Sequence, residues 1–160
     1  MRRIGHPVRG IRVPALIQGE LTFLDFPPRG GRWSALSFPS TFGLIESVFL
    51  DRQTGVFERE DATLFAVIPS EGVLRESWCR QFGKLRIPLL ADPLRRLRKV
   101  FGLAISDSPT RCQSLLLDPT GVFRFHLTHD LNGRGMGARL EIIKASQQRA
   151  VTPPLAFAKP

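Results

Sequence analysis

Apolar residues along this chain follow two spacings, one typical of β-strands and one typical of α-helices. Alternating or continuous β-rich apolar runs predict six strands, at residues 11–26 (two strands around Gln18-Gly19), 33–38, 63–69, 112–118 and 122–128. The run 63–69, "TLFAVIP", is apolar at almost every position, so we expect a central strand covered on both faces. The last two strands flank a turn at 119–121, which predicts a hairpin.

Helical spacing appears in four further segments, 41–60, 70–84, 93–102 and 136–147. In the first we expect Leu44, Val48 and Phe57 to face inward. Asp92 is the expected cap of the third helix, and Gly102 is its expected end. Strands that alternate with helices, followed by a hairpin and a last helix, predict an α/β sandwich with a central mixed β-sheet flanked by helices.

The composition indicates one folded domain. The chain has 160 residues, 42% of them hydrophobic and 23% charged, which suits a globular protein and not a disordered one. We divide it into a basic segment (1–10), a domain (11–148) and an extended, proline-rich tail (149–160). The sequence has no apolar run of about 20 residues and no apolar signal stretch after its basic start, so we expect a cytoplasmic protein without a membrane span.

Arginine dominates the charge of this chain. The net charge is +9, and 19 of the 23 basic residues are arginines. Such a surface attracts an acidic protein, a multi-subunit assembly, anionic headgroups or nucleic acid. Nucleic acid is the less favoured partner because no aromatic stacking platform is evident, and solvated helix faces are the simplest alternative. The residues concerned are Arg2, Arg3, Arg9, Arg12, Arg95, Arg96, Arg98 and Lys99.

Four segments together resemble the peroxiredoxin family of the AhpC/thiol-specific antioxidant type. They are "GGRWSALSFPSTF" (30–42), "IPLLADP" (87–93) with the helix after it, "RCQSLLLDPTGVFRFHLTHDLNGRG" (111–135) and the closing "VTPPLAFAKP" (151–160). The resemblance covers roughly residues 11–155. It implies a thioredoxin-like fold and an ancestry among thiol peroxidases, whose nucleophile is a cysteine thiolate.

The nucleophile of that family is missing at the matching place. The family carries Pro-x-x-x-Thr-x-x-Cys on the strand-to-helix turn, and here the stretch is "FPSTFGLIESVF" (38–49). Pro39 matches the family's proline, and the cysteine slot falls on Glu46 or on Gly43, depending on the register. Arg111 matches the family's active-site arginine. We expect Arg111 to pair with Glu46, the alternative being that it holds an anionic ligand.

Cys79 and Cys112 are the candidates for a substitute nucleophile. Buried packing is the default for both, since cysteine is among the most buried residue types. Cys112 follows a cation, which would lower its pKa. However, if Arg111 points into the site, strand alternation turns Cys112 to the opposite face.

The strand at 122–128 alternates apolar and polar residues, which indicates a half-buried strand. In the family the matching strand lies at the sheet edge and pairs with its twin. An unpaired edge is an aggregation hazard, so we expect a homodimer, or another chain, along this edge. The interface would comprise Val122, Phe123, Arg124, Phe125, His126, Leu127 and Thr128. His126 and His129 are three apart and face opposite sides, so they cannot share a metal ion.

The leading hypothesis is therefore a peroxiredoxin-like protein that has lost peroxidase chemistry and works as a structural or binding subunit. One rival is a thiol peroxidase that uses Cys112 or Cys79. The other is an arginine-rich binder of nucleic acid or an anionic surface. None of these requires a cofactor.

Overall fold

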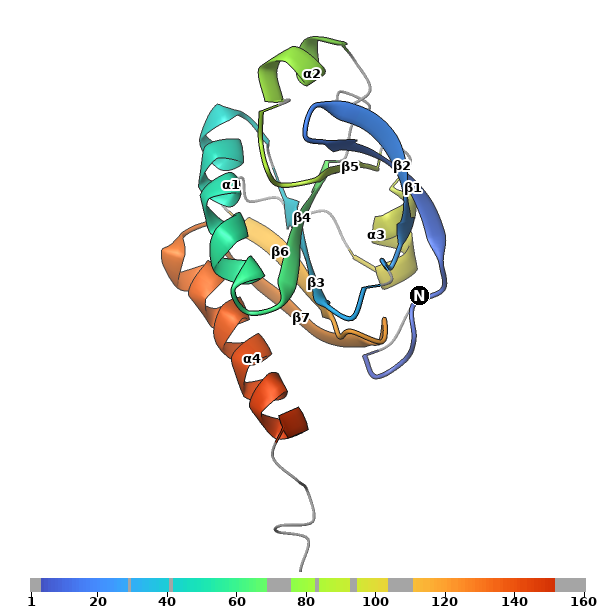
Figure 1. Cartoon of the computed structure of the whole chain (residues 1–160), viewed down its shortest axis with the longest axis vertical. Helices are drawn as coiled ribbons and strands as arrows, with labels where there is room; N and C mark the ends of the chain where they lie inside the picture. Colours follow the sequence, from blue (N-terminus) through green and yellow to red (C-terminus); the bar gives the residue numbers. More distant parts are fainter. Residues whose placement is uncertain are drawn as a thin grey trace, which may run out of the picture.

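A seven-stranded mixed sheet forms the centre of the molecule, with strand order β2-β1-β5-β4-β3-β6-β7 (Figure 1). The computed structural model describes residues 4–28, 30–40, 42–68, 76–82, 84–92, 95–103 and 111–151. β3, β4 and β5 are parallel, whereas the strands on either side of them pair antiparallel. The predicted mixed sheet is therefore confirmed.

The strands follow the predicted pattern closely. They are β1 (Ile11–Ile17), β2 (Glu20–Phe26), β3 (Trp33–Pro39), β4 (Ala62–Ile68), β5 (Leu89–Ala91), β6 (Arg111–Leu117) and β7 (Phe123–Asp130). β5 was not predicted, because its length of three residues is too short to show a period. β4 lies inside the sheet with five consecutive buried residues, as its continuous apolar run predicts.

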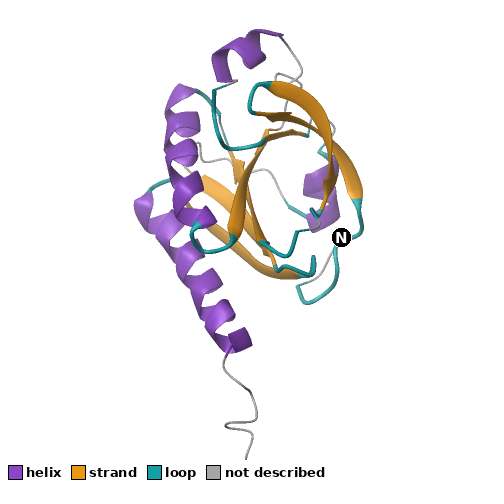
Figure 2. Cartoon of the chain, in the orientation of Figure 1, coloured by secondary structure: helices purple, strands orange, loops and turns teal. Residues whose placement is uncertain are grey.

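Helices cover both faces of the sheet (Figure 2). They are α1 (Leu44–Glu58), α2 (Glu76–Phe82), α3 (Arg96–Phe101) and α4 (Gly133–Val151). One core joins α1, α2 and α4 to the first face of the sheet, and a second core joins α3 to the opposite face. The predicted sandwich, with helices flanking a central sheet, is confirmed. No helix in the described ranges is long and apolar enough to cross a membrane.

The inward face of α1 differs from the prediction. Leu44 is 65% exposed and Val48 is 36% exposed, although both were expected inside. The buried face instead carries Ser47, Leu50, Thr54 and Phe57. Leu50 and Phe57 are seven residues apart and set the phase of the helix, which turns Leu44 and Val48 outward.

The ends of α3 and α4 also differ from the prediction. α3 begins later than expected, yet Asp92 still caps it, because its Oδ1 accepts the Leu97 amide at 3.0 Å. Gly102 ends α3 in the left-handed region, as predicted. α4 begins at Gly133 and continues to Val151, beyond both ends of its predicted range. The expected cap of α2, Ser70, lies outside the described residues.

Candidate functional site

The turn from β3 into α1 holds the two positions where the resemblance places a cysteine. Gly43 is the N-cap of α1, and its amide donates to Glu46 Oε1 at 2.7 Å. A carboxylate in the first turn accepts a hydrogen bond from an amide that the helix leaves unpaired, and its negative charge interacts favourably with the positive end of the helix dipole. In either register, therefore, the position that matches the family's cysteine is occupied by Gly43 or Glu46, the two residues that form this N-terminal cap.

The expected ion pair between Arg111 and Glu46 does not form. Arg111 Nε lies 3.5 Å from Oδ1 of Asp130, its cross-strand partner, and both side chains are about half exposed. The Arg111 backbone oxygen accepts the Ser40 hydroxyl at 2.8 Å, which fixes the start of β6 beside the turn after Pro39. The main chain of Arg111 thus lies at the site, while its guanidinium is drawn to β7.

Cys112 and Arg111 face opposite sides of the sheet, and Cys112 faces the side that α4 covers. Its Sγ lies 3.9 Å from Ser114 Oγ, and strand alternation then turns Arg111 to the other face. Cys112 is fully buried and stands opposite Pro39 on β3 and His129 on β7. Burial raises the pKa of the Cys112 thiol and outweighs the nearby Arg139 charge and the Ser114 hydrogen bond. The thiol is therefore protonated at neutral pH.

The inner face of α4 carries a buried arginine, Arg139, that was not predicted. Arg139 is completely buried; its Nη1 donates to Ser37 Oγ at 2.9 Å, and its Cζ lies 5.3 Å from the Phe57 ring centroid. Among the described residues, Nε and Nη2 of Arg139 have no hydrogen-bond partner. Burial lowers the pKa of Arg139 to about 10, so the guanidinium is still charged at neutral pH. The helical spacing from Met136 could have marked this position as inward, but an arginine does not read as a core residue.

The half-buried His129 lies beside Ser114 and Cys112 on the neighbouring strand. Its Nδ1 donates to the Asp130 carbonyl at 2.7 Å, and its Nε2 accepts the Ser114 hydroxyl at 2.6 Å. Gly135, in the first turn of α4, lies so close to the His129 ring that an added Cβ would collide with it. His126 lies on the exposed face of β7, so the two histidines face opposite sides as predicted.

β7 is the last strand of the sheet, which confirms the predicted edge. Part of that edge is already paired, because the Gly5 amide donates to the Phe123 oxygen and the Phe123 amide donates to the His6 oxygen. Val122 likewise forms a bridge with Pro7. Of the predicted interface, residues 124–128 are the part that lies beyond these contacts.

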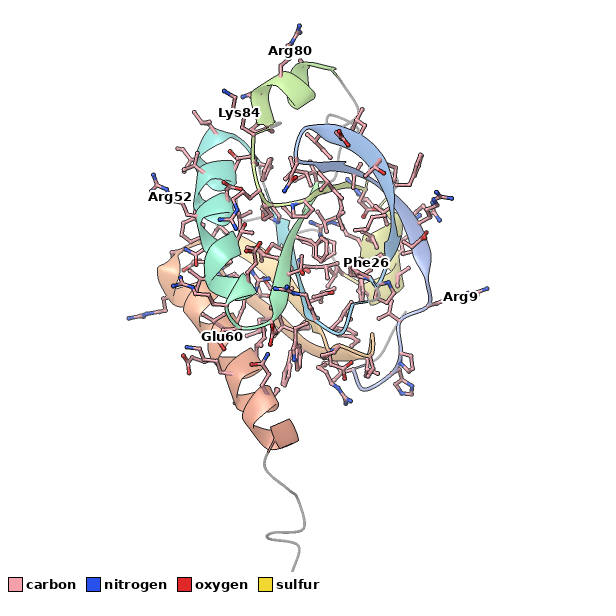
Figure 3. The ribbon with its side chains drawn as sticks, in the orientation of Figure 1. Arg9, Phe26, Arg52, Glu60, Arg80 and Lys84 are labelled. Atoms are coloured by element: carbon pink, nitrogen blue, oxygen red, sulfur yellow. The ribbon has the colours of Figure 1, made fainter. Side chains whose placement is uncertain are left out.

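Five of the eight residues expected on a basic surface are exposed. They are Arg9, Arg12, Arg95, Arg96 and Lys99, and Arg9 projects away from the body of the molecule (Figure 3). Arg98 does not belong to this surface, since it is buried with its Cζ 5.3 Å from the Phe38 ring centroid. Arg2 and Arg3, and the side chain of Cys79 on α2, lie outside the described part of the chain.

The chain is similar to several known peroxiredoxins. No family model matches the chain. It is 26% identical over 157 residues to peroxiredoxin tpx1 of Schizosaccharomyces pombe, covering 91% of this chain and 82% of the relative. It is 25% identical over 162 residues to alkyl hydroperoxide reductase C of Pseudomonas aeruginosa, covering 96% and 87%.

A solved structure agrees with these relatives. The AhpC structure of Enterococcus faecalis superposes with a TM-score of 0.74 at 22% identity, covering 96% of this chain and all of that one. That likeness confirms the thioredoxin-like fold. The relatives match along most of its length, so the chain is similar to peroxiredoxins in sequence as well as in fold.

Proposed function

We propose that this chain is a catalytically silent peroxiredoxin, a structural or binding subunit that acts through contacts with other protein chains. The observation that carries the proposal is the start of α1. There the helix is capped by the Glu46 carboxylate, at the place where the family carries its nucleophile.

The capping pair opposes peroxide chemistry in two ways. Reduction of a peroxide needs a nucleophile that gives an electron pair to the O–O bond and can then be reduced again, and a carboxylate or a glycine cannot do this. The Glu46 carboxylate also accepts the hydrogen bond of the Gly43 amide, and it places a negative charge at the positive end of α1. The peroxide oxygen that gains negative charge as the O–O bond breaks would be repelled by this carboxylate, and the Gly43 amide would not be free to stabilise it.

Cys112 supports the same proposal. A peroxide-reactive cysteine is a partly exposed thiolate, whereas Cys112 is fully buried and its pKa is raised by that burial. Free buried thiols are typical of a reducing compartment, so we also propose a cytoplasmic location.

The rival activity is a thiol peroxidase with a relocated nucleophile, like the alkyl hydroperoxide reductase among the relatives. One observation favours it: the buried Arg139 charge acts on Cys112 in the direction of a thiolate. A transient opening of α4 would be needed to bring peroxide to the sulfur.

A single-turnover experiment separates the two functions. Fully reduced protein is mixed with hydrogen peroxide, free thiols are counted over time, and the modified cysteine is located by mass spectrometry. We expect thiol loss no faster than for an ordinary exposed thiol, and the same slow rate in the Cys112→Ser and Cys79→Ser variants. Rapid and selective oxidation of either cysteine, abolished by its own serine variant, would refute the silent subunit.

A further inference from the structure

A pocket between β1 and the start of α3 has the properties of an anchor site. Its volume is about 150 Å³, a size that holds a benzene-sized apolar group. Its walls are mostly apolar and come from three elements of the fold. The lining consists of Ile11, Val13, Pro14, Ala91 and Leu97, together with Arg12, Asp92 and Arg96.

Of the charged side chains at this pocket, the acidic one is hydrogen-bonded within the chain, whereas a basic one is open to a ligand. The Asp92 carboxylate is used internally, because Oδ1 accepts the Leu97 amide at 3.0 Å and Oδ2 accepts the Arg98 amide at 3.3 Å. Arg96 is exposed, and no ion pair or hydrogen bond of its side chain occurs within the described ranges. The pocket therefore offers positive charge to a ligand, while its negative charge stays with the start of α3.

Arg12 adds a second cation from β1. Its Nε lies 3.9 Å from Asp25 Oδ1, and the two side chains are 71% and 90% exposed, so the pair is weak. The Arg12 Cζ lies 5.2 Å from the ring centroid of Phe23, which is itself 61% exposed. Arginine beside an exposed aromatic ring is typical of interface hot spots.

The apolar surface continues beyond the pocket. Ile11 and Arg12 also line a shallow groove that includes Phe23 and Leu24 on β2. β1, β2 and α3 lie on the same side of the molecule (Figure 1). An extended segment could therefore lie across β1 with one side chain in the pocket and its neighbours in the groove beside Ile11 and Leu24.

We propose that this surface binds an acidic segment of a partner protein, with a leucine or phenylalanine of that segment anchored in the pocket. The inference deepens the proposed function and rests on it, because it names the partner chemistry of a binding subunit. Charge complementarity selects the occupant, since Arg12, Arg95, Arg96 and Lys99 are exposed around β1 and α3 and the chain carries a net charge of +9. Nucleic acid would meet the arginines through its phosphates, which have nothing apolar to place in the pocket.

The test uses three labelled nine-residue peptides and the full chain. The first has a central leucine flanked by Asp and Glu, the second has glycine in place of that leucine, and the third has lysine in place of every acidic residue. Fluorescence anisotropy at about 150 mM salt should show binding of the first, at least tenfold weaker binding of the second, and none of the third.

Two charge-reversal variants localise the binding. Arg96→Glu should weaken binding of the leucine peptide at least tenfold, and it should remain folded because a carboxylate suits the first turn of a helix. Arg52→Glu is the matched control, since Arg52 is an exposed arginine on α1, far from the pocket (Figure 3). It should bind like the unaltered chain.

Methyl NMR of the complex distinguishes occupation of the pocket from binding by charge attraction alone. The methyl signals of Val13 and Leu97 should shift on titration with the leucine peptide, and those of Leu64 should not. Equal binding of the leucine and glycine peptides, or full competition by a DNA duplex without shifts at Val13 and Leu97, would overturn the anchor pocket. Absence of binding would also overturn it. None of these outcomes depends on peroxide reactivity, so the silent-site proposal stands or falls separately.

Discussion

Arg139 shows how one side chain can depart from the pattern around it. Burying a charge without a countercharge is costly, and the described residues give this guanidinium only Ser37 Oγ, the Met136 sulfur and the Phe57 ring. Two of its nitrogens have no partner. We infer that Arg139 lowers the stability of the fold.

Replacing Arg139 by an uncharged residue should therefore stabilise the fold. Arg139→Met keeps an unbranched side chain while removing the charge and the unpaired donors, so we expect the free energy of unfolding to rise by about 1–4 kcal/mol. Urea denaturation followed by circular dichroism measures it. Arg134→Met, at an exposed position of the same helix, should change the stability by less than about 0.5 kcal/mol. A loss of stability in Arg139→Met would mean that its contacts outweigh the cost of burial.

Residue types could be predicted from the sequence better than residue orientations. The resemblance pointed to the segment around Pro39, which has no cysteine in either register. It could not show that Arg111 turns toward Asp130 or that Cys112 turns inward. Strand alternation fixes only the relative directions of neighbours, and the choice of face depends on the sheet that forms around them.

Among the elements, α4 was located correctly, but its close contact with β7 was not predicted. Its first turn approaches β7 through Gly135, and an added Cβ there would collide with the His129 ring and with the Asp130 backbone oxygen. Gly137 lies in the same helix, and the position that its Cβ would occupy is open. The two glycines thus offer a matched pair with opposite expected effects.

Substitution of each glycine by alanine tests how tightly α4 packs. Gly135→Ala should destabilise the fold by about 1–3 kcal/mol, because the backbone must shift to relieve the contact. Gly137→Ala should stabilise it by about 0.5–1 kcal/mol, because alanine has the higher helix propensity. Urea denaturation of both variants in parallel measures the difference. Two changes of the same sign would show that α4 does not approach His129 this closely.

α1 and β5 show why elements are predicted more easily than their faces. The segment 41–60 was correctly predicted as a helix, yet its apolar residues occupy positions on both sides, and Ser47 and Thr54 are buried with Leu50 and Phe57. The phase therefore depends on the packing partner and not on the helix alone. β5 forms because β4 and β1 both pair with its three residues, which is a tertiary cause without a local signal.

At the scale of the whole molecule, the two halves of the chain meet in the sheet. β6, from the C-terminal half, pairs with β3 next to β4 in the centre, and β7 becomes the outer strand. The order of strands did not follow from periodicity. The half-polar pattern of β7 predicted only its half-buried face, and its edge position was expected from the family resemblance. The chain's own N-terminal segment covers the beginning of that edge, so a second chain would have to use residues 124–128.

The oligomeric state tests that edge. Antiparallel pairing of two copies around His126 would place Thr128 of one copy opposite Arg124 of the other, so lysines at 126 and 128 add repulsion across the twofold axis. We expect sedimentation velocity at micromolar concentration to give twice the chain mass of 17.9 kDa. The double variant His126→Lys with Thr128→Lys should sediment as a monomer. Thr22→Lys, on the opposite edge strand β2, should remain dimeric, whereas a monomer in every sample would exclude pairing through β7.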